Sequence, residues 1–175
     1  NLRQGLGWQA EQYDEAVQLA QLAAGAYGDD LVITGHSLGG GLAATASFAT
    51  GNAAVTFNAS GVHDTTIRNL NLAVDTARAD AEGGQIRRYN VDGDPLTTAQ
   101  QDTWVVNHGL PDAPGHEITL DSPYPPLEGP ERTWNPVEYA KRVTEHSRAK
   151  LERAGELHSQ QGVIDALTQQ RPWES

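Results

Sequence analysis

A serine lies at the centre of a glycine-flanked motif, Gly35-His36-Ser37-Leu38-Gly39, within the stretch LVITGHSLGGGLAAT. Apolar and β-branched residues precede the motif, and small residues typical of a closely packed helix follow it. In a strand–turn–helix of this G-x-S-x-G type, a nucleophile elbow, the glycines permit a sharp turn that lifts the serine hydroxyl above a sheet. We therefore predict that Ser37 is a nucleophile, with a glycine-rich structural turn as the alternative.

Such a serine needs three further groups. A hydroxyl is a weak nucleophile unless a histidine takes its proton and an acid orients that histidine, and after an elbow of this type the acid precedes the histidine along the chain. The N–H of Leu38 comes first in the following helix, where partial positive charge stabilises a developing oxyanion. We predict Leu38 as one oxyanion donor.

Two aspartates compete for the orienting acid. The stretch RRYNVDGDPLT places Asp92 at the end of an expected strand and Asp94 in the turn before a proline. The triad acid normally follows a strand, but aspartates in turns also cap the backbone and can be purely structural. We prefer Asp94 and keep Asp92 as the alternative acid.

Of the six histidines, His36 and His63 precede the expected acid and are better explained as an elbow-packing residue and a loop residue. Three others are candidates for the base. His158 occupies the joint between two expected helices, where a loop can reach across the top of a sheet. His116 stands in a proline-rich region, where it is equally a surface turn residue, and His146 falls within a long polar helix, where a histidine is most often just solvated. We prefer His158 as the base, with His116 and His146 as alternatives.

Alternating helices and strands must position these groups. The periodicity predicts an amphipathic helix over 11–27, a short strand at 31–34 covered on both faces, and a helix over 38–50. Further strands are expected at 53–60 and 85–91, separated by a helical segment over 64–81. Strands that alternate with helices indicate an α/β fold with a mostly parallel sheet, and the length of 175 residues suits one domain.

The region from 110 to 136 is a long proline-rich loop with a short strand at EITL. Loops of this length in a compact domain are usually functional or mobile, so we expect either a lid or acyl-chain wall, or a surface connection. Asn135 followed by Pro136 predicts the start of a long helix. A final helix is expected near Ser159, with Val163, Ile164 and Leu167 facing inward.

The composition excludes several classes of binding partner and cofactor. With 12 Lys and Arg against 23 Asp and Glu, the formal net charge is −11, which disfavours nucleic acid and other polyanions. There is no cysteine, no apolar run long enough to span a bilayer, and no spaced acidic loop that would indicate calcium. We expect a soluble protein that needs no metal or other cofactor.

The stretches LVITGHSLGGGLA, VTFNASGV and RRYNVDGDPLT together resemble the lipase class 3 type of α/β-hydrolase. The chain is more similar still to the lipase-like phospholipase domains of bacterial effectors. Their QGxG…QYxxAVxLA pattern matches residues 4–20, their Y-x-V-x-G-D/E-x-L-T turn matches 89–97, and their H-x-x-x-x-V-I-x-x-L pattern matches 158–167. This resemblance implies an α/β-hydrolase fold with Asp94 as the acid and His158 as the base.

The resemblance also implies a function. It predicts a serine esterase that hydrolyses carboxylic esters of lipids, most closely a phospholipase A acting as an antibacterial effector. Such a protein would be exported or delivered to a target cell and paired with an inhibitory immunity protein. A binding module built on a degenerate hydrolase, and a hydrolase of soluble esters or thioesters, are the alternatives.

One departure from the pattern concerns the N-terminal side. Class 3 lipase domains carry a longer segment before the elbow, including the loop that donates a second oxyanion group. Only 36 residues precede Ser37 here. We therefore expect the C-terminal part of a larger domain or protein, which by its own sequence supplies one oxyanion donor.

Overall fold

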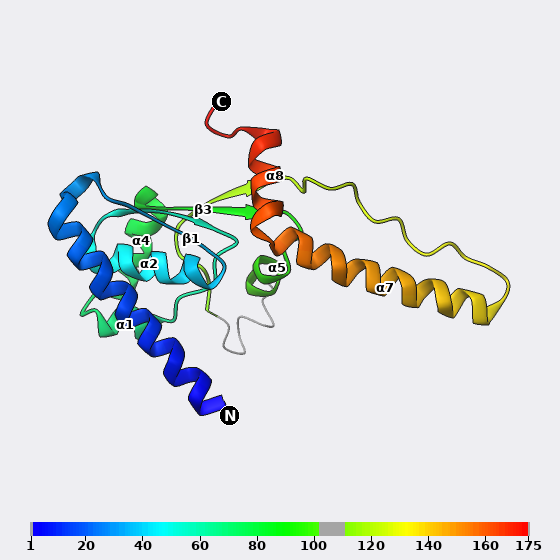
Figure 1. The fold of residues 1–175 in the computed structure, drawn as a ribbon, viewed down its shortest axis with the longest axis horizontal. Coiled ribbons are helices and arrows are strands. Elements are labelled where there is room, and N and C mark those ends of the chain that lie inside the picture. The colour runs from blue at the N-terminus through cyan, green and yellow to red at the C-terminus, as the bar shows by residue number, and fades with distance from the viewer. Residues whose placement is uncertain (1, 102–110, 175) are drawn as a thin grey trace.

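A four-stranded parallel sheet forms the centre of the molecule (Figure 1). The computed structural model describes the backbone of residues 2–101 and 111–174 and the side chains of residues 11–98 and 111–174. Its strands follow the order of the chain, namely β1 (Val32–His36), β2 (Ala53–Phe57), β3 (Ile86–Val91) and β4 (His116–Leu120). Helices flank this sheet, which confirms the predicted α/β fold with parallel strands.

The register of the sheet brings the ends of its strands into line. His36 is paired with Phe57, Phe57 with Tyr89, and Val91 with Leu120. The carboxyl ends of all four parallel strands therefore meet at one edge, where ligands of α/β sheets usually bind. β1 is the outer strand at one side of the described sheet, and Val32 is 57% exposed, so the expectation that both faces of this strand are covered was wrong.

The helices between β1 and β3 pack a first hydrophobic core against the sheet. α1 (Leu2–Tyr27) ends in a short 3-10 turn (Gly28–Asp30), and α2 (Leu38–Thr50) follows the elbow directly. The predicted helix over 64–81 is divided into α3 (Asp64–Asn69) and α4 (Val74–Asp80), because Asn71 adopts a positive φ of 61° that interrupts it. A turn over Ala81–Gln85 then leads into β3. The buried members of this core are Ala44, Phe48, Ala54, Val62, Ile67, Ala77, Ala81 and Ile86.

α7 (Pro136–His158) and the segment 121–135 project from the body as an arm (Figure 1). The Asn135 side chain caps α7 as predicted, accepting hydrogen bonds from the amides of Val137 and Glu138. The predicted loop over 110–136 contains β4. The first residue of this loop, 110, lies outside the described residues. Beyond β4 it runs along α7, since Arg153 donates to the carbonyl of Pro125 at 2.6 Å.

A second hydrophobic core anchors the inner end of this arm. It contains Val91, Leu120, Leu157, Val163 and Ala166, which join β3 and β4 to the end of α7 and to α8 (Gln160–Gln170). Val163 faces inward as predicted, but Ile164 is 47% exposed, so its predicted inward position was wrong. Ala166 is buried, because a residue three positions after Val163 lies on the same face of a helix. Packing of Leu157 and Val163 fixes the joint between α7 and α8.

The two glycines of the elbow motif differ in the space around them. A Cβ at Gly35 would overlap the carbonyl group of Gly39, whereas a Cβ at Gly39 would meet nothing within 4 Å. We expect Gly35→Ala to lower the free energy of unfolding by about 1–3 kcal/mol, because the turn must open to accept the methyl group. Gly39→Ala, the matched control within α2, should be neutral or raise it by up to about 1 kcal/mol. Urea denaturation of both variants tests this, and equal destabilisation would contradict it.

Candidate active site

Ser37 occupies a strained turn between β1 and α2. Its backbone adopts φ 56° and ψ −124°, a conformation that non-glycine residues rarely hold without support from their surroundings. That support comes from both sides, since the Ser37 amide donates to the carbonyl of Phe57 at 3.0 Å and its carbonyl accepts from the amide of Ser60 at 2.9 Å. The geometry is that of a sharp strand-to-helix turn that presents a side chain at the carboxyl edge of the sheet.

His158 reaches this serine from a distant part of the chain. The Nε2 atom of His158 lies 2.8 Å from Ser37 Oγ, although 121 positions separate the two residues. His158 is the last residue of α7, so the buried Leu157 beside it holds the imidazole at the edge of the sheet. The His36 ring adds a second restraint, because its Nε2 lies 2.7 Å from the carbonyl oxygen of His158.

Asp94 completes a hydrogen-bonded series. Its Oδ1 lies 2.7 Å from His158 Nδ1, while its Oδ2 accepts a hydrogen bond from the Thr97 amide at 2.7 Å. The carboxylate is fully buried in the turn between β3 and α5 (Pro95–Gln101), a short helix that sequence reasoning did not predict. Gly93 allows this tight turn through its φ of 81°.

The buried carboxylate determines the electrostatics of the imidazole. The hydrogen bond from His158 to Asp94 raises the pKa of His158 above its ordinary value, and the charge of Asp94 adds to the effect, while partial burial opposes it. A hydroxyl hydrogen-bonded to an imidazole whose other nitrogen binds a carboxylate is the arrangement that general-base activation of a serine requires.

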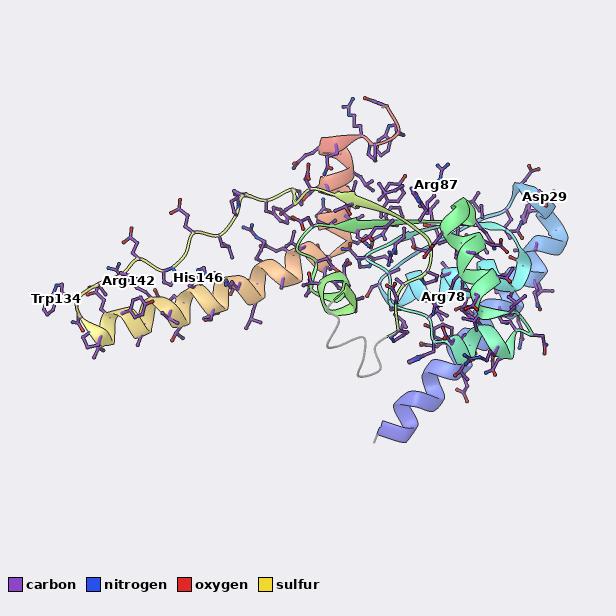
Figure 2. The ribbon with its side chains drawn as sticks, turned by 180° about the vertical axis from the view of Figure 1, so that it is seen from behind. Asp29, Arg78, Arg87, Trp134, Arg142 and His146 are labelled. Carbon is purple, nitrogen blue, oxygen red and sulfur yellow. The ribbon has the colours of Figure 1, made fainter. Side chains whose placement is uncertain are left out.

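The alternative residues lie elsewhere. His116 begins β4 and pairs with Arg87, so it stands at the amino end of the strands, opposite Ser37. His146 lies part-way along the projecting arm, as Figure 2 shows, and twelve positions before His158 on the same helix. Asp92 is exposed, and its amide donates to the carbonyl of Leu120 at 2.7 Å. None of the three is brought together with Ser37.

Leu38 is the first residue of α2. The first four amides of a helix have no acceptor within it and carry partial positive charge, so the Leu38 N–H has the location that an oxyanion donor needs. Trp134 falls in the loop over 110–136, for which a lid or acyl-chain wall is one expectation, and it is 94% exposed at the outer end of the arm (Figure 2). The lid therefore stays a prediction.

Other kinds of site are not found in the described part of the chain. Within residues 11–98 and 111–174, no group of three or more His, Asp or Glu side chains is placed to hold a metal ion. None of the helices in the described ranges combines the length and the apolar character needed to cross a bilayer.

Comparison with known proteins decides the family. Residues 1–120 match the model of the Tle-like phospholipase domain, a stretch that includes Ser37 and Asp94. The chain belongs to the Tle-like phospholipase domain family. It is also 44% identical over all 175 residues to the extracellular phospholipase A1 of Serratia liquefaciens. This Tle-like phospholipase domain spans 50% of the length of that relative, and the aligned region includes His158, which lies beyond the family match.

Sequence reasoning missed two contacts within this Tle-like phospholipase domain. His36 was interpreted only as a residue that packs against the elbow, whereas its side chain contacts the His158 carbonyl. Asn58 was passed over altogether, although its carboxamide binds main-chain atoms of both segments that carry the acid and the imidazole. The sequence does hold one signal for Asn58. An asparagine directly after a strand tolerates a positive φ and so indicates a sharp turn at that point.

Proposed function

We propose that this chain provides the catalytic centre of a serine phospholipase, which cleaves a carboxylic ester of a glycerophospholipid through an acyl-enzyme. The observation that carries the proposal is the hydrogen-bonded series from Ser37 Oγ through His158 to Asp94, with distances of 2.8 Å and 2.7 Å. Membership of the Tle-like phospholipase domain family supports the substrate class.

The reaction follows from the geometry. Ser37 Oγ attacks the ester carbonyl while its proton passes to Nε2 of His158, and Asp94 stabilises the imidazolium that forms. The Leu38 N–H binds the oxyanion of the tetrahedral intermediate. As the intermediate collapses, the ester C–O bond breaks, and the imidazolium returns the proton to the departing lysophospholipid alkoxide. Water then attacks the acyl-enzyme by the same steps and releases the fatty acid.

A cavity beside the elbow supports a lipid substrate. It has a volume of about 430 Å³ and is lined in part by Leu38, Leu70, Leu96 and Val17, while Tyr13 and Ser60 add hydroxyl groups. No lysine or arginine of the described chain lines it. The lining also contains the carboxylate of Asp14, which would repel a phosphate group. The cavity therefore suits an acyl chain better than a phosphate, since burial of apolar surface is favourable.

The relative suggests the finer assignment. The Serratia liquefaciens protein is called an extracellular phospholipase A1, so we extend to this chain cleavage of a phospholipid acyl ester and export from the cell. The role of an antibacterial effector, and a cognate immunity protein as its partner, belong to the proposal through the resemblance in the sequence. The proposed steps need no metal ion.

Phospholipid vesicles with different labels in the two acyl chains test this function. We expect release of fatty acid that persists in excess EDTA, and reaction of Ser37 with a fluorophosphonate probe. Hydrolysis of a short soluble ester without release from vesicles would favour a soluble ester or thioester hydrolase. Absence of both turnover and labelling would favour a binding module built on a degenerate hydrolase.

Replacement of Asp94 by asparagine should lower kcat by about 10⁴-fold, because the amide cannot hold the imidazole in the productive tautomer or stabilise its charge. The pH profile gives a second readout. Neutral His158 is the active form, and its pKa is raised by Asp94, so wild-type kcat/KM should rise with pH through a midpoint above about 6.5. In Asp94→Asn that midpoint should move to lower pH, because the carboxylate that raised the pKa is gone. Asp92→Asn is the matched control and should change neither quantity.

A further inference from the structure

Asn58 lies at the carboxyl edge of the sheet, directly after β2, and is fully buried. Its backbone has a positive φ of 41°, a conformation that asparagine tolerates better than most residues. Its amide donates to the carbonyl of Tyr89 at 2.9 Å, which continues the pairing of β2 with β3 beyond the strand. The main chain therefore fixes where the Asn58 side chain begins.

The carboxamide of Asn58 binds two segments that are far apart in the sequence. Its Oδ1 accepts a hydrogen bond from the amide of Val91 at 2.9 Å, and its Nδ2 donates to the carbonyl of Leu157 at 3.0 Å. Val91 is the last residue of β3 and accepts at its carbonyl the amide of Asp94 at 3.0 Å. Leu157 directly precedes His158. One side chain thus joins the turn that carries the acid to the helix end that carries the base.

The carboxamide of Asn58 can hold the two segments at a fixed distance, because both of its hydrogen bonds come from one planar group. An asparagine offers an acceptor and a donor on one rigid planar group, and buried polar atoms are costly when they lose their partners. Aspartate would keep the acceptor but place an oxygen against the Leu157 carbonyl. A glycine would keep the positive φ and remove both bonds. Few other changes at this position preserve the backbone.

We propose that Asn58 is a positioning residue, which sets the distance between Asp94 and His158 by tying their main chains together. The inference rests on the proposed function of these two residues. It goes further, because it assigns the alignment of the acid and the base to a residue that touches neither side chain. The His36 side chain, which contacts the His158 carbonyl at 2.7 Å, restrains the same helix end from the side of the elbow.

Replacement of Asn58 by glycine tests the proposal. We expect kcat for ester hydrolysis to fall by about 10- to 100-fold with KM changed by less than about 3-fold, because small misplacements of reacting groups cost that much. Asn52→Gly is the matched control. Asn52 is also buried and donates to a main-chain carbonyl, that of Gly28 at 2.8 Å, but it precedes β2 and lies at the opposite end of the strand. Its kcat should stay within about 2-fold of wild type.

Two readouts separate positioning from a loss of stability. When Asn58→Gly is added to Asp94→Asn, kcat should fall by less than about 2-fold further, since residues that act through one another are not additive. NMR titration of His158 should also give a lower pKa in Asn58→Gly, because a looser hydrogen bond to Asp94 raises the pKa less. The NMR readout does not depend on turnover.

Several results would overturn the proposal. They are wild-type kcat and an unchanged His158 pKa in folded Asn58→Gly, a fall in kcat equal to that of Asn52→Gly, or a full further loss in the Asp94→Asn background. If Asn58→Gly does not fold, Asn58→Asp, which keeps the shape and the Val91 bond, must show the same fall in kcat. Failure of the proposed function is distinct, since wild type itself would then neither release fatty acid nor react with the fluorophosphonate.

Discussion

Replacement of Ser37 by alanine should lower kcat for phospholipid hydrolysis by about 10⁶-fold, because the group that forms the acyl-enzyme is lost and only binding and oxyanion stabilisation remain. Labelling by a fluorophosphonate should disappear in the same variant, since the probe reacts only with an activated serine. The change removes one oxygen atom. The elbow should therefore keep its fold, and the urea midpoint should stay close to that of wild type.

Ser147→Ala is the control for this result. Ser147 is an exposed serine on α7, where its hydroxyl donates to the carbonyl of Val143 at 2.8 Å. We expect this variant to keep wild-type turnover and labelling. Fatty-acid release that survives in Ser37→Ala, with labelling intact, would show that the nucleophile lies elsewhere in the protein.

Replacement of His158 by alanine should lower kcat by a similar factor of about 10⁶, because Ser37 would lose the group that takes its proton. In the structure the two side chains lie 2.8 Å apart, and His158 is 29% exposed, so the space that the deletion leaves is open to water. Measurement of kcat with a soluble ester and of the labelling rate should show the same loss.

The two alternative histidines provide matched controls. His116→Ala changes the amino end of β4, and His146→Ala changes the arm, so both should keep kcat within about 2-fold of wild type. A large loss in His116→Ala together with normal turnover in His158→Ala would reverse our assignment of the base.

Local signals in the sequence predict much of the fold. The apolar run before Ser37, the small residues after it and the Asn135-Pro136 cap are short-range features, and they give β1, α2 and the start of α7. The break between α3 and α4 was missed because it depends on one residue, Asn71, in the left-handed region. The outward position of Ile164 was missed because helical spacing alone leaves the centre of the buried face undetermined.

The sequence likewise predicts some contacts of the site and not others. The sequence predicts that Ser37, Asp94 and His158 come together. Each residue type has a chemical task, and each lies in a turn after a strand or at the end of a helix. The contacts of Asn58 and His36 could not be predicted in this way. Their partners at the end of α7 lie 99 and 122 positions away, and only the packing of that helix end on the sheet brings them within reach.

The order of these residues along the chain has a consequence for biosynthesis. A ribosome makes Ser37 before His158, and the base exists only 121 residues later. Because chains fold progressively from the N-terminus, the elbow can form while its serine is still an ordinary alcohol. In the proposed mechanism, the ability to attack lipids therefore arises only after His158 has been made and the inner turn of α7 has docked on the sheet.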